Sequence, residues 1–210
     1  MPIDLELLGV DTLVLDLGGV LLELDELLPW EQFRSIGADI DTPEIQEKLF
    51  ELCNLFEVGG KEPMEWAKEM AEIMGIDCSF AEVFEIWNSM LLDIPDERID
   101  VIRELSKRYR LILLSNTNEI HLRTLYSREH LNYEEDKLLG DHFDQEYFSN
   151  KLGLRKPDRE IFEVVLEHND LEPSQCLFID DKVYNLQGAV EVGMNVYHLD
   201  LTKEDFSELF

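Results

Sequence analysis

Three short runs in this sequence are apolar throughout and end in polar residues. They are Leu13-Val14-Leu15-Asp16, Leu111-Ile112-Leu113-Leu114-Ser115-Asn116 and Cys176-Leu177-Phe178-Ile179-Asp180-Asp181. Runs without a polar face that alternate with helical segments are typical of a parallel sheet covered by helices on both sides. In such a sheet, ligands bind beyond the carboxyl ends of the strands. The sequence therefore predicts an α/β fold whose site combines carboxylates with hydroxyl and amide groups.

The segments around these runs continue the alternation. The first strand is expected over Leu13–Leu17, followed by a hairpin-like extension over Val20–Leu24, and the last strand over Asn195–Leu199. Helices are expected at about Glu97–Lys107, near Glu119–Glu129, and at Asp158–His168 and Asn185–Val192. An aromatic-rich segment, Gln145–Ser149, follows a polar stretch.

Between the first two runs the pattern becomes entirely helical. Amphipathic segments are expected at Pro29–Phe33, Thr42–Phe56, Glu62–Met74 and Ser79–Leu91. Thr42 and Ser79 are suitable helix starts and Gly75 a suitable helix stop, while Pro95 breaks the pattern. We therefore expect a core domain over 1–24 and 93–210, interrupted by a helical insert over 25–92.

Composition excludes several classes of function. The formal net charge of -29, from 47 acidic and 18 basic residues, would repel nucleic acids and anionic membrane surfaces. The apolar stretches are too short to span a membrane and the first residues lack the basic start of a secretory signal, so a cytoplasmic location is expected. Cys53, Cys78 and Cys176 are widely spaced, without a CxxC pair, and are interpreted as reduced thiols.

The strand-end residues form a chemically coherent set. Asp16, Asp180 and Asp181 would supply oxygen ligands of the kind that Mg²⁺ prefers, and Lys156 stands in a loop that could add a cation. Taken alone, Asp180 and Asp181 would fit a turn or a helix cap equally well, because aspartate does both. Their combination with Asp16 and Lys156 favours a site for a small anionic ligand.

In this combination the chain resembles the haloacid dehalogenase (HAD) superfamily. The four motifs of that family are matched in order by Asp16-Leu17-Gly18-Gly19-Val20, Leu114-Ser115-Asn116-Thr117-Asn118, Lys156-Pro157-Asp158 and Phe178-Ile179-Asp180-Asp181. The resemblance implies a three-layer Rossmann-like fold with a parallel sheet in the order 5-4-1-2-3. It also implies that the helical insert is a C1 cap that closes over the substrate.

The resemblance further implies a role for each motif residue. Asp16 would attack phosphorus and form an aspartyl-phosphate, Ser115 and Asn116 would bind the phosphoryl oxygens, and Lys156 would neutralise charge. Mg²⁺ would lie between Asp16, the Gly18 carbonyl and Asp181, with Asp180 as a direct ligand or behind one. Gly19, Arg34 and Lys156 are the expected substrate-binding residues. The implied activity is a Mg²⁺-dependent phosphatase of a small phosphorylated metabolite, such as a sugar phosphate.

Gly18 departs from the family pattern. Most family phosphatases carry at that position an Asp that protonates the leaving group, a contribution of roughly 10²- to 10⁴-fold. Asp25 or a residue of the cap could take its place. Two alternatives follow: a catalytically weak binding or regulatory protein, and a metal-independent 2-haloacid dehalogenase, which the paired Asp180 and Asp181 disfavour.

The cap is expected to select the substrate. Candidates near its entrance are Trp30, Phe33, Arg34, Glu57 and Lys61. The aromatic residues Trp30, Phe33, Trp66 and Trp87 fit the core of the cap better than a ligand platform. The histidines 121, 130, 142, 168 and 198 are dispersed and none is assigned to a metal, whereas Asn185 could either bind the Asp181 loop or start a helix.

Overall fold

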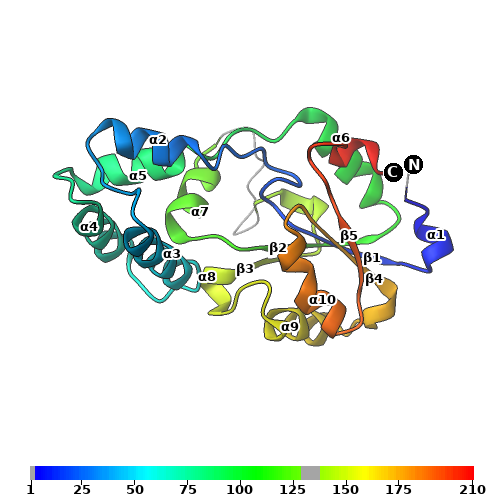
Figure 1. Ribbon diagram of the computed structural model, residues 1–210. Helices are drawn as coiled ribbons and strands as arrows, with labels where there is room; N and C mark the ends of the chain where they lie inside the picture. The colour runs from blue at the N-terminus through cyan, green and yellow to red at the C-terminus, as the bar shows by residue number, and fades with distance from the viewer. Residues whose placement is uncertain (1–2, 129–137) are drawn as a thin grey trace.

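The computed structural model describes residues 3–128 and 138–210, so that Glu129, the expected end of one helix, and His130 lie outside the described residues. Five strands form one sheet in the order β3-β2-β1-β4-β5 (Figure 1). They are β1 (Thr12–Leu15), β2 (Arg110–Ser115), β3 (Gln145–Phe148), β4 (Cys176–Asp180) and β5 (Asn195–His198). All neighbouring pairs are parallel, which confirms the predicted sheet and its order.

The first strand lies at the centre of the sheet. Leu15 is level with Leu113 of β2 and Ile179 of β4, so the next residue, Asp16, emerges where both neighbours end. Alternate β1 side chains enter different cores: Leu13 and Leu15 face one hydrophobic cluster and Val14 the other. A strand buried on both faces has no place for a charged side chain before its end, which is why its first carboxylate appears at the edge of the sheet.

Helices cover both faces of the sheet and make the fold three-layered. Helices α1 (Leu5–Leu8), α6 (Asp96–Leu105) and α7 (Glu119–Tyr126) contribute to the cluster that contains Leu13. Helices α9 (Arg159–Asn169) and α10 (Leu186–Glu191) contribute to the cluster on the opposite face. Shorter elements are α8 (Ser149–Leu152) and 3-10 turns at Gly140–His142, Pro173–Gln175, Val183–Asn185 and Phe206–Glu208.

The insertion between β1 and β2 begins with four helices that form a hydrophobic core of their own. They are α2 (Leu28–Ser35), α3 (Pro43–Glu57), α4 (Pro63–Met74) and α5 (Phe80–Asn88), at the left of Figure 1. We call this part the cap. The predicted helix starts at Thr42 and Ser79 and the predicted stop at Gly75 are confirmed. Thr42 caps α3, Ser79 forms a reciprocal capping box with Glu82, and Gly75 ends α4 in the left-handed conformation at φ 68°.

The hairpin-like extension predicted over Val20–Leu24 is wrong. The chain turns sharply instead, because the amides of Leu21 and Leu22 both donate to the Leu17 carbonyl. Only isolated bridges form there, pairing Gly18 with Leu22 and Leu24 with Leu91. Burial of Val20, Leu21 and Leu22 in the main core stabilises this turn in place of a strand ladder.

Candidate active site

Asp16 lies directly after the central strand, with 7% of its surface exposed. Its Oδ1 accepts from the Leu17 amide at 2.7 Å and contacts Lys156 Nζ at 2.7 Å. Oδ2 makes no hydrogen bond among the described residues. Burial raises the pKa of Asp16 to about 8, and the charges of Asp180 and Asp181 add to this rise while Lys156 opposes it. One oxygen of the carboxylate is thus held by the protein, and the other has no hydrogen-bond partner among the described residues.

Lys156 is fully buried and joins three strand ends. Its Nζ donates to the Leu114 carbonyl at 2.9 Å and to Asp180 Oδ2 at 2.7 Å, in addition to its contact with Asp16. Burial alone would lower the pKa of the ammonium, but Asp16 and Asp180 outweigh burial and raise it. The side chain therefore carries a fixed positive charge between β1, β2 and β4.

Asp180 has both oxygens engaged by the protein. Besides Lys156, it accepts from the Lys182 amide at 2.8 Å and from Asn185 Nδ2 at 3.0 and 2.9 Å. Asn185 makes no side-chain cap at the start of α10, so of its two predicted roles the structure shows the hydrogen bond to this loop. Because both of its oxygens are already hydrogen-bonded, Asp180 is suited to positioning Lys156.

Asp181 presents the opposite situation. Its Oδ1 is buried without a hydrogen-bond partner among the described residues, while Oδ2 lies 3.3 Å from Lys182 Nζ. Burial and the charge of Asp180 raise its pKa, against the effect of Lys182. Gly19, at φ 78°, lets the turn approach closely, because a Cβ there would lie 2.6 Å from Asp181 Cγ.

The three carboxylates fit a hard divalent cation. Asp16, Asp180 and Asp181 offer oxygen atoms that all lie within 4.8 Å of one another. Lys156 compensates Asp16 and Asp180, but the buried Asp181 Oδ1 has no hydrogen-bond partner among the described residues, and an unpartnered buried oxygen normally has a ligand. All-oxygen donors of this type match Mg²⁺.

Ser115 and Asn116 occupy the end of β2 but have different surroundings. The Ser115 hydroxyl is buried and, within the described part of the chain, makes only a 3.5 Å contact to the Asn116 carbonyl, which leaves it available to a ligand. Asn116 instead accepts from the Lys156 amide and donates to the Lys156 carbonyl, both at 2.9 Å. Its amide group therefore positions the Lys156 loop, while its expected contact with phosphoryl oxygens stays a prediction.

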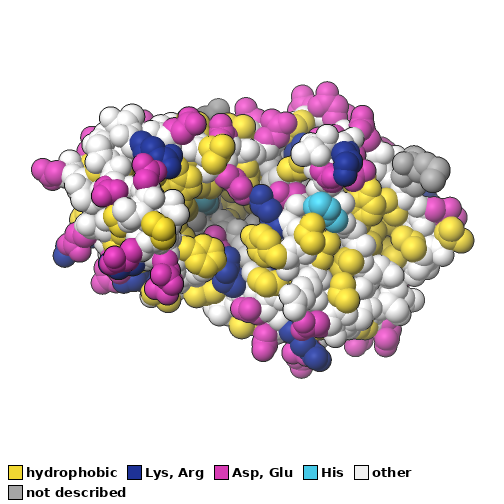
Figure 2. Space-filling view, in the orientation of Figure 1, with side chains coloured by type: hydrophobic (Ala, Val, Ile, Leu, Met, Phe, Trp, Pro, Cys, Tyr) yellow, Lys and Arg dark blue, Asp and Glu magenta, His cyan; other side chains and the backbone are white. Residues whose placement is uncertain are grey.

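A cavity of about 290 Å³ separates these strand ends from the cap. Figure 2 shows a hollow in the surface between the cap and the sheet. Gly18, Ser115 and Asn116 line the cavity from the core, and Glu57 and Trp87 from the cap. Its mixed polar and apolar walls suit a small organic molecule.

Leu24 fills the space beside Gly18. A Cβ on Gly18 would lie 2.6 Å from Leu24 Cδ1, so a larger residue at this position requires Leu24 to move. Asp25, one expected substitute for the missing acid, accepts from the amides of Leu27 and Leu28 at the start of α2. It does not line the 290 Å³ cavity.

His121 is a further polar residue of the cavity that sequence reasoning did not assign to the site. Asn118 Oδ1 accepts from two amides at the start of α7, so its Nδ2 faces His121 Nδ1 at 3.1 Å and donates to it. The neutral ring therefore carries its proton on Nε2, which has no hydrogen-bond partner among the described residues. Burial lowers the pKa of His121 to about 4, against a smaller opposing effect of the Trp87 backbone. The sequence signal that could have identified His121 is its position three residues after Asn118, the last residue of the second motif.

The structure places Arg34 away from the strand ends. It pairs with Asp41 at 2.9 Å and lines a separate apolar pocket in the cap, together with Trp30, Ile40 and Phe50. Its predicted role as a phosphate clamp therefore has no geometric support. Phe33 and Trp66 are fully buried in the cap core as predicted, whereas Trp30 and Trp87 pack there and also line the 290 Å³ cavity.

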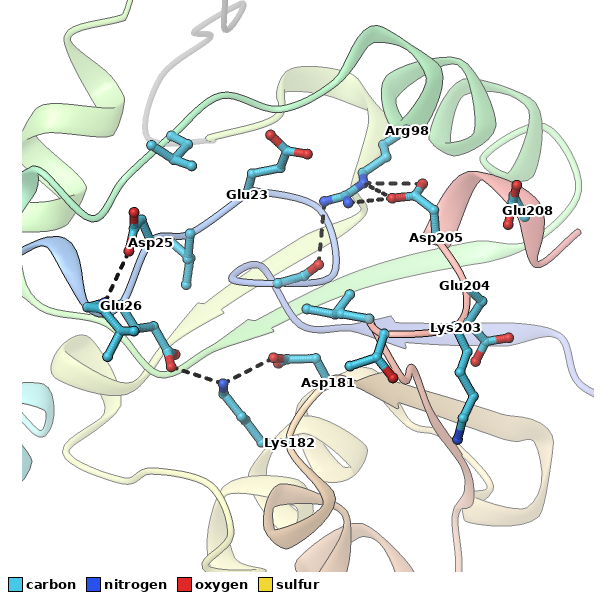
Figure 3. A pocket seen from close by; sticks show the side chains of 16 residues that line it. Glu23, Asp25, Glu26, Arg98, Asp181, Lys182, Lys203, Glu204, Asp205 and Glu208 are labelled. Atoms are coloured by element: carbon cyan, nitrogen blue, oxygen red, sulfur yellow. Dashed lines mark hydrogen bonds and ion pairs between the residues drawn. The ribbon is translucent and has the colours of Figure 1, made fainter.

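A larger cavity, of about 880 Å³, is lined by Asp181 and Lys182 (Figure 3). Lys182 pairs there with both Asp181 and Glu26, the latter at 3.1 Å. Arg98, which is buried, donates to the carbonyls of Gly19 and Leu21 and pairs with Asp205 at 3.1 Å. Arg98 therefore fixes the turn that follows Asp16.

Residues 10–193 match the family of haloacid dehalogenase-like hydrolases. The chain belongs to this family. It is similar to D-ribitol-5-phosphate phosphatase of Bacteroides thetaiotaomicron, with 29% identity over 90% of this chain and 91% of the relative. It is also similar to the sesquiterpene phosphatase AstK of Aspergillus oryzae, with 29% identity over 89% and 88% of the two chains.

A solved structure of the same family resembles this fold closely. The HAD family enzyme BT-2542 of Bacteroides thetaiotaomicron, in complex with magnesium and inorganic phosphate, has a TM-score of 0.82 and 34% identity. The similarity covers 96% of this chain and 100% of that enzyme. The predicted family, fold and cap insertion are therefore confirmed. None of the helices in the described part of the chain is long and apolar enough to cross a membrane.

Proposed function

We propose that this protein is a Mg²⁺-dependent phosphatase of a small phosphorylated metabolite, with sugar or polyol phosphates as the substrate class. The observation that carries the proposal is the cluster of Asp16, Lys156, Asp180 and Asp181 beside a cavity enclosed by the cap. Two relatives that match over most of their length are named as phosphatases, and BT-2542 binds magnesium and phosphate. These similarities support the same chemistry here.

The residues suggest a division of labour in a two-step reaction. Oδ2 of Asp16 is the oxygen free to attack phosphorus, because Oδ1 is held by the Leu17 amide and Lys156. The bond from phosphorus to the leaving oxygen then breaks and an aspartyl-phosphate forms, which water hydrolyses in the second step. Lys156 and the Ser115 hydroxyl would stabilise the negative charge on the phosphoryl group.

Asp16, Asp181 and the Gly18 carbonyl are the proposed ligands of Mg²⁺, with Asp180 behind them. The free Asp181 Oδ1 supports this assignment. The ion would neutralise the phosphate and keep the Asp16 carboxylate ionised, which a nucleophile with a pKa of about 8 requires at neutral pH.

A substrate screen tests the proposal. The purified protein is assayed for phosphate release with Mg²⁺ on pentose, hexose and polyol phosphates, alongside Asp16→Asn and the matched exposed variant Asp100→Asn. We expect activity that Asp16→Asn abolishes, Asp100→Asn retains and a chelator removes. Unchanged activity in Asp16→Asn would refute the proposed nucleophile. Binding of phosphate and metal without turnover would favour the alternative of a binding protein.

A further inference from the structure

The proposed reaction lacks a proton donor at Gly18, and the structure contains a carboxyl group that could replace it. We propose that Glu57, the last residue of α3, protonates the leaving oxygen and later activates water. This inference rests on the proposed phosphatase function. It assigns to a cap residue the task that most family phosphatases assign to the position of Gly18.

The position of Glu57 supports the proposal. Glu57 lines the 290 Å³ cavity together with Gly18, Ser115 and Asn116, although it comes from the cap. It lies close enough to Lys156 for the lysine charge to lower its pKa, and Lys156 itself contacts Asp16 at 2.7 Å. The Glu57 carboxyl group therefore faces the space where a leaving group bound to the phosphate must lie.

The hydrogen bonding of Glu57 leaves one oxygen for a ligand. Oε2 accepts from Arg155 Nη2 at 2.8 Å and Nε at 3.2 Å, and Oε1 has no partner among the described residues. Glu26, another carboxylate that lines this cavity, is 55% exposed in its side chain and is held by Lys182, compared with 26% for Glu57. A general acid must be positioned and partly desolvated, and Glu57 meets both conditions better.

The cap and the core fix Glu57 together. The Ser149 hydroxyl donates to the Glu57 carbonyl at 2.6 Å, and Arg155 stands directly before Lys156 in the core loop. Gly59 packs so closely on the core that a Cβ would lie 2.4 Å from the Asn150 carbonyl oxygen. Because α3 ends on the core at this point, the carboxyl group keeps its place beside the strand ends.

The electrostatic surroundings favour the protonated form of Glu57 more than water does. Burial raises the pKa of Glu57, and the opposing charges of Arg155 and Lys156 do not cancel that rise. In the first step, Asp16 bonds to phosphorus, the ester bond breaks, and the proton of Glu57 moves to the leaving oxygen to give an alcohol. In the second, the Glu57 carboxylate takes a proton from water as the water oxygen attacks phosphorus, and Asp16 is released.

The decisive experiment compares two leaving groups in the Glu57→Gln variant. Ribitol 5-phosphate releases an alcohol that needs a proton, whereas 4-nitrophenyl phosphate releases a phenolate that does not. We expect kcat/KM, which reports the first step, to fall by about 10² or more on ribitol 5-phosphate and by less than about tenfold on the aryl ester. We also expect a burst of one equivalent of 4-nitrophenol, because water activation becomes slow.

Two further variants separate proton transfer from a structural role. Glu26→Gln is the matched control and is expected to keep the ratio of the two kcat/KM values found for the parent. Gly18→Asp with Leu24→Ala, placed in the Glu57→Gln protein, restores a carboxyl group and is expected to recover at least about tenfold on ribitol 5-phosphate. The substrate ratio is unaffected by partial unfolding, since only folded protein turns over.

Specific outcomes would overturn the inference. An equal loss on both substrates, or no loss, would show that Glu57 does not transfer the proton. If the parent hydrolyses neither ester, the proposed phosphatase function fails for these substrates and the role of Glu57 fails with it. Activity in the parent combined with an unchanged ratio in Glu57→Gln refutes the role of Glu57 alone.

Discussion

The buried imidazole of His121 predicts a measurable loss of stability in mild acid. The pKa of His121 falls from 6.5 to about 4 because the ring is buried against the cap. In the unfolded chain the same ring takes up a proton near pH 6.5, so protons favour the unfolded state. The free energy of unfolding is therefore unaffected by His121 above about pH 6.5, and it falls progressively as the pH decreases toward about 4.

The size of this effect follows from the two pKa values. The full difference between the folded and unfolded pKa values corresponds to about 3 kcal/mol of unfolding free energy. About 2 kcal/mol of this is lost between about pH 7.5 and about pH 5. His121→Phe keeps a ring to stack on Trp87, which lies at 5.6 Å and 14° to the imidazole. The substitution should cost about 1–3 kcal/mol at about pH 7.5, because Asn118 Nδ2 loses its acceptor.

Urea unfolding at both pH values measures the difference. The free energy of unfolding of the parent should fall by about 2 kcal/mol more than that of His121→Phe on moving from about pH 7.5 to about pH 5. Titrating carboxylates contribute equally to both proteins and cancel in the comparison. His168→Gln, which alters an exposed histidine, is the matched control. Parallel pH profiles for the parent and His121→Phe would refute the reasoning.

Three other predictions concern the site and its support. Lys156→Met leaves Asp16 and Asp180 buried without their cation and should lower the free energy of unfolding by about 3–5 kcal/mol. A loss below about 1 kcal/mol in urea titrations would contradict that charge arrangement. Gly188→Ala should cost about 1–3 kcal/mol, because its Cβ would lie 2.2 Å from the Pro157 carbonyl oxygen, and an unchanged melting temperature would argue against this close packing. Saturating Mg²⁺ should stabilise the protein by about 2.7 kcal/mol at a hundred times its Kd and a chelator should reverse this, whereas equal melting temperatures with and without the ion would speak against the metal site.

The parts of this structure that could be predicted from sequence are those that local pattern determines. Apolar runs identify buried parallel strands, and strand ends in such a sheet necessarily meet at one edge. This is why Asp16, Ser115 and Asp180 could be placed together before their distances were known. The ends of the cap helices followed in the same way from Thr42 and Gly75, because capping depends on a few neighbouring residues.

The parts that could not be predicted depend on pairs far apart in the chain. Arg155 and Glu57 are 98 positions apart and Asn116 and Lys156 are 40 apart, so no local pattern encodes their hydrogen bonds. Distant contacts of this kind decide which polar residues remain free for a ligand. A closer pair has the same effect in the cap, where Asp41, seven positions further along the chain, pairs with Arg34, which was expected at the site because of its charge.

The contact between Arg98 and Asp205 has a practical consequence for work on this protein. Asp205 lies beyond residue 193, where the match to the family ends, yet its partner Arg98 holds the carbonyls of Gly19 and Leu21 (Figure 3). A version trimmed to residues 10–193 would keep all four motifs but would lose the contact between Asp205 and Arg98. Such a version would also lose β5 (Asn195–His198), so a lack of activity in it would not count against the proposed catalytic residues.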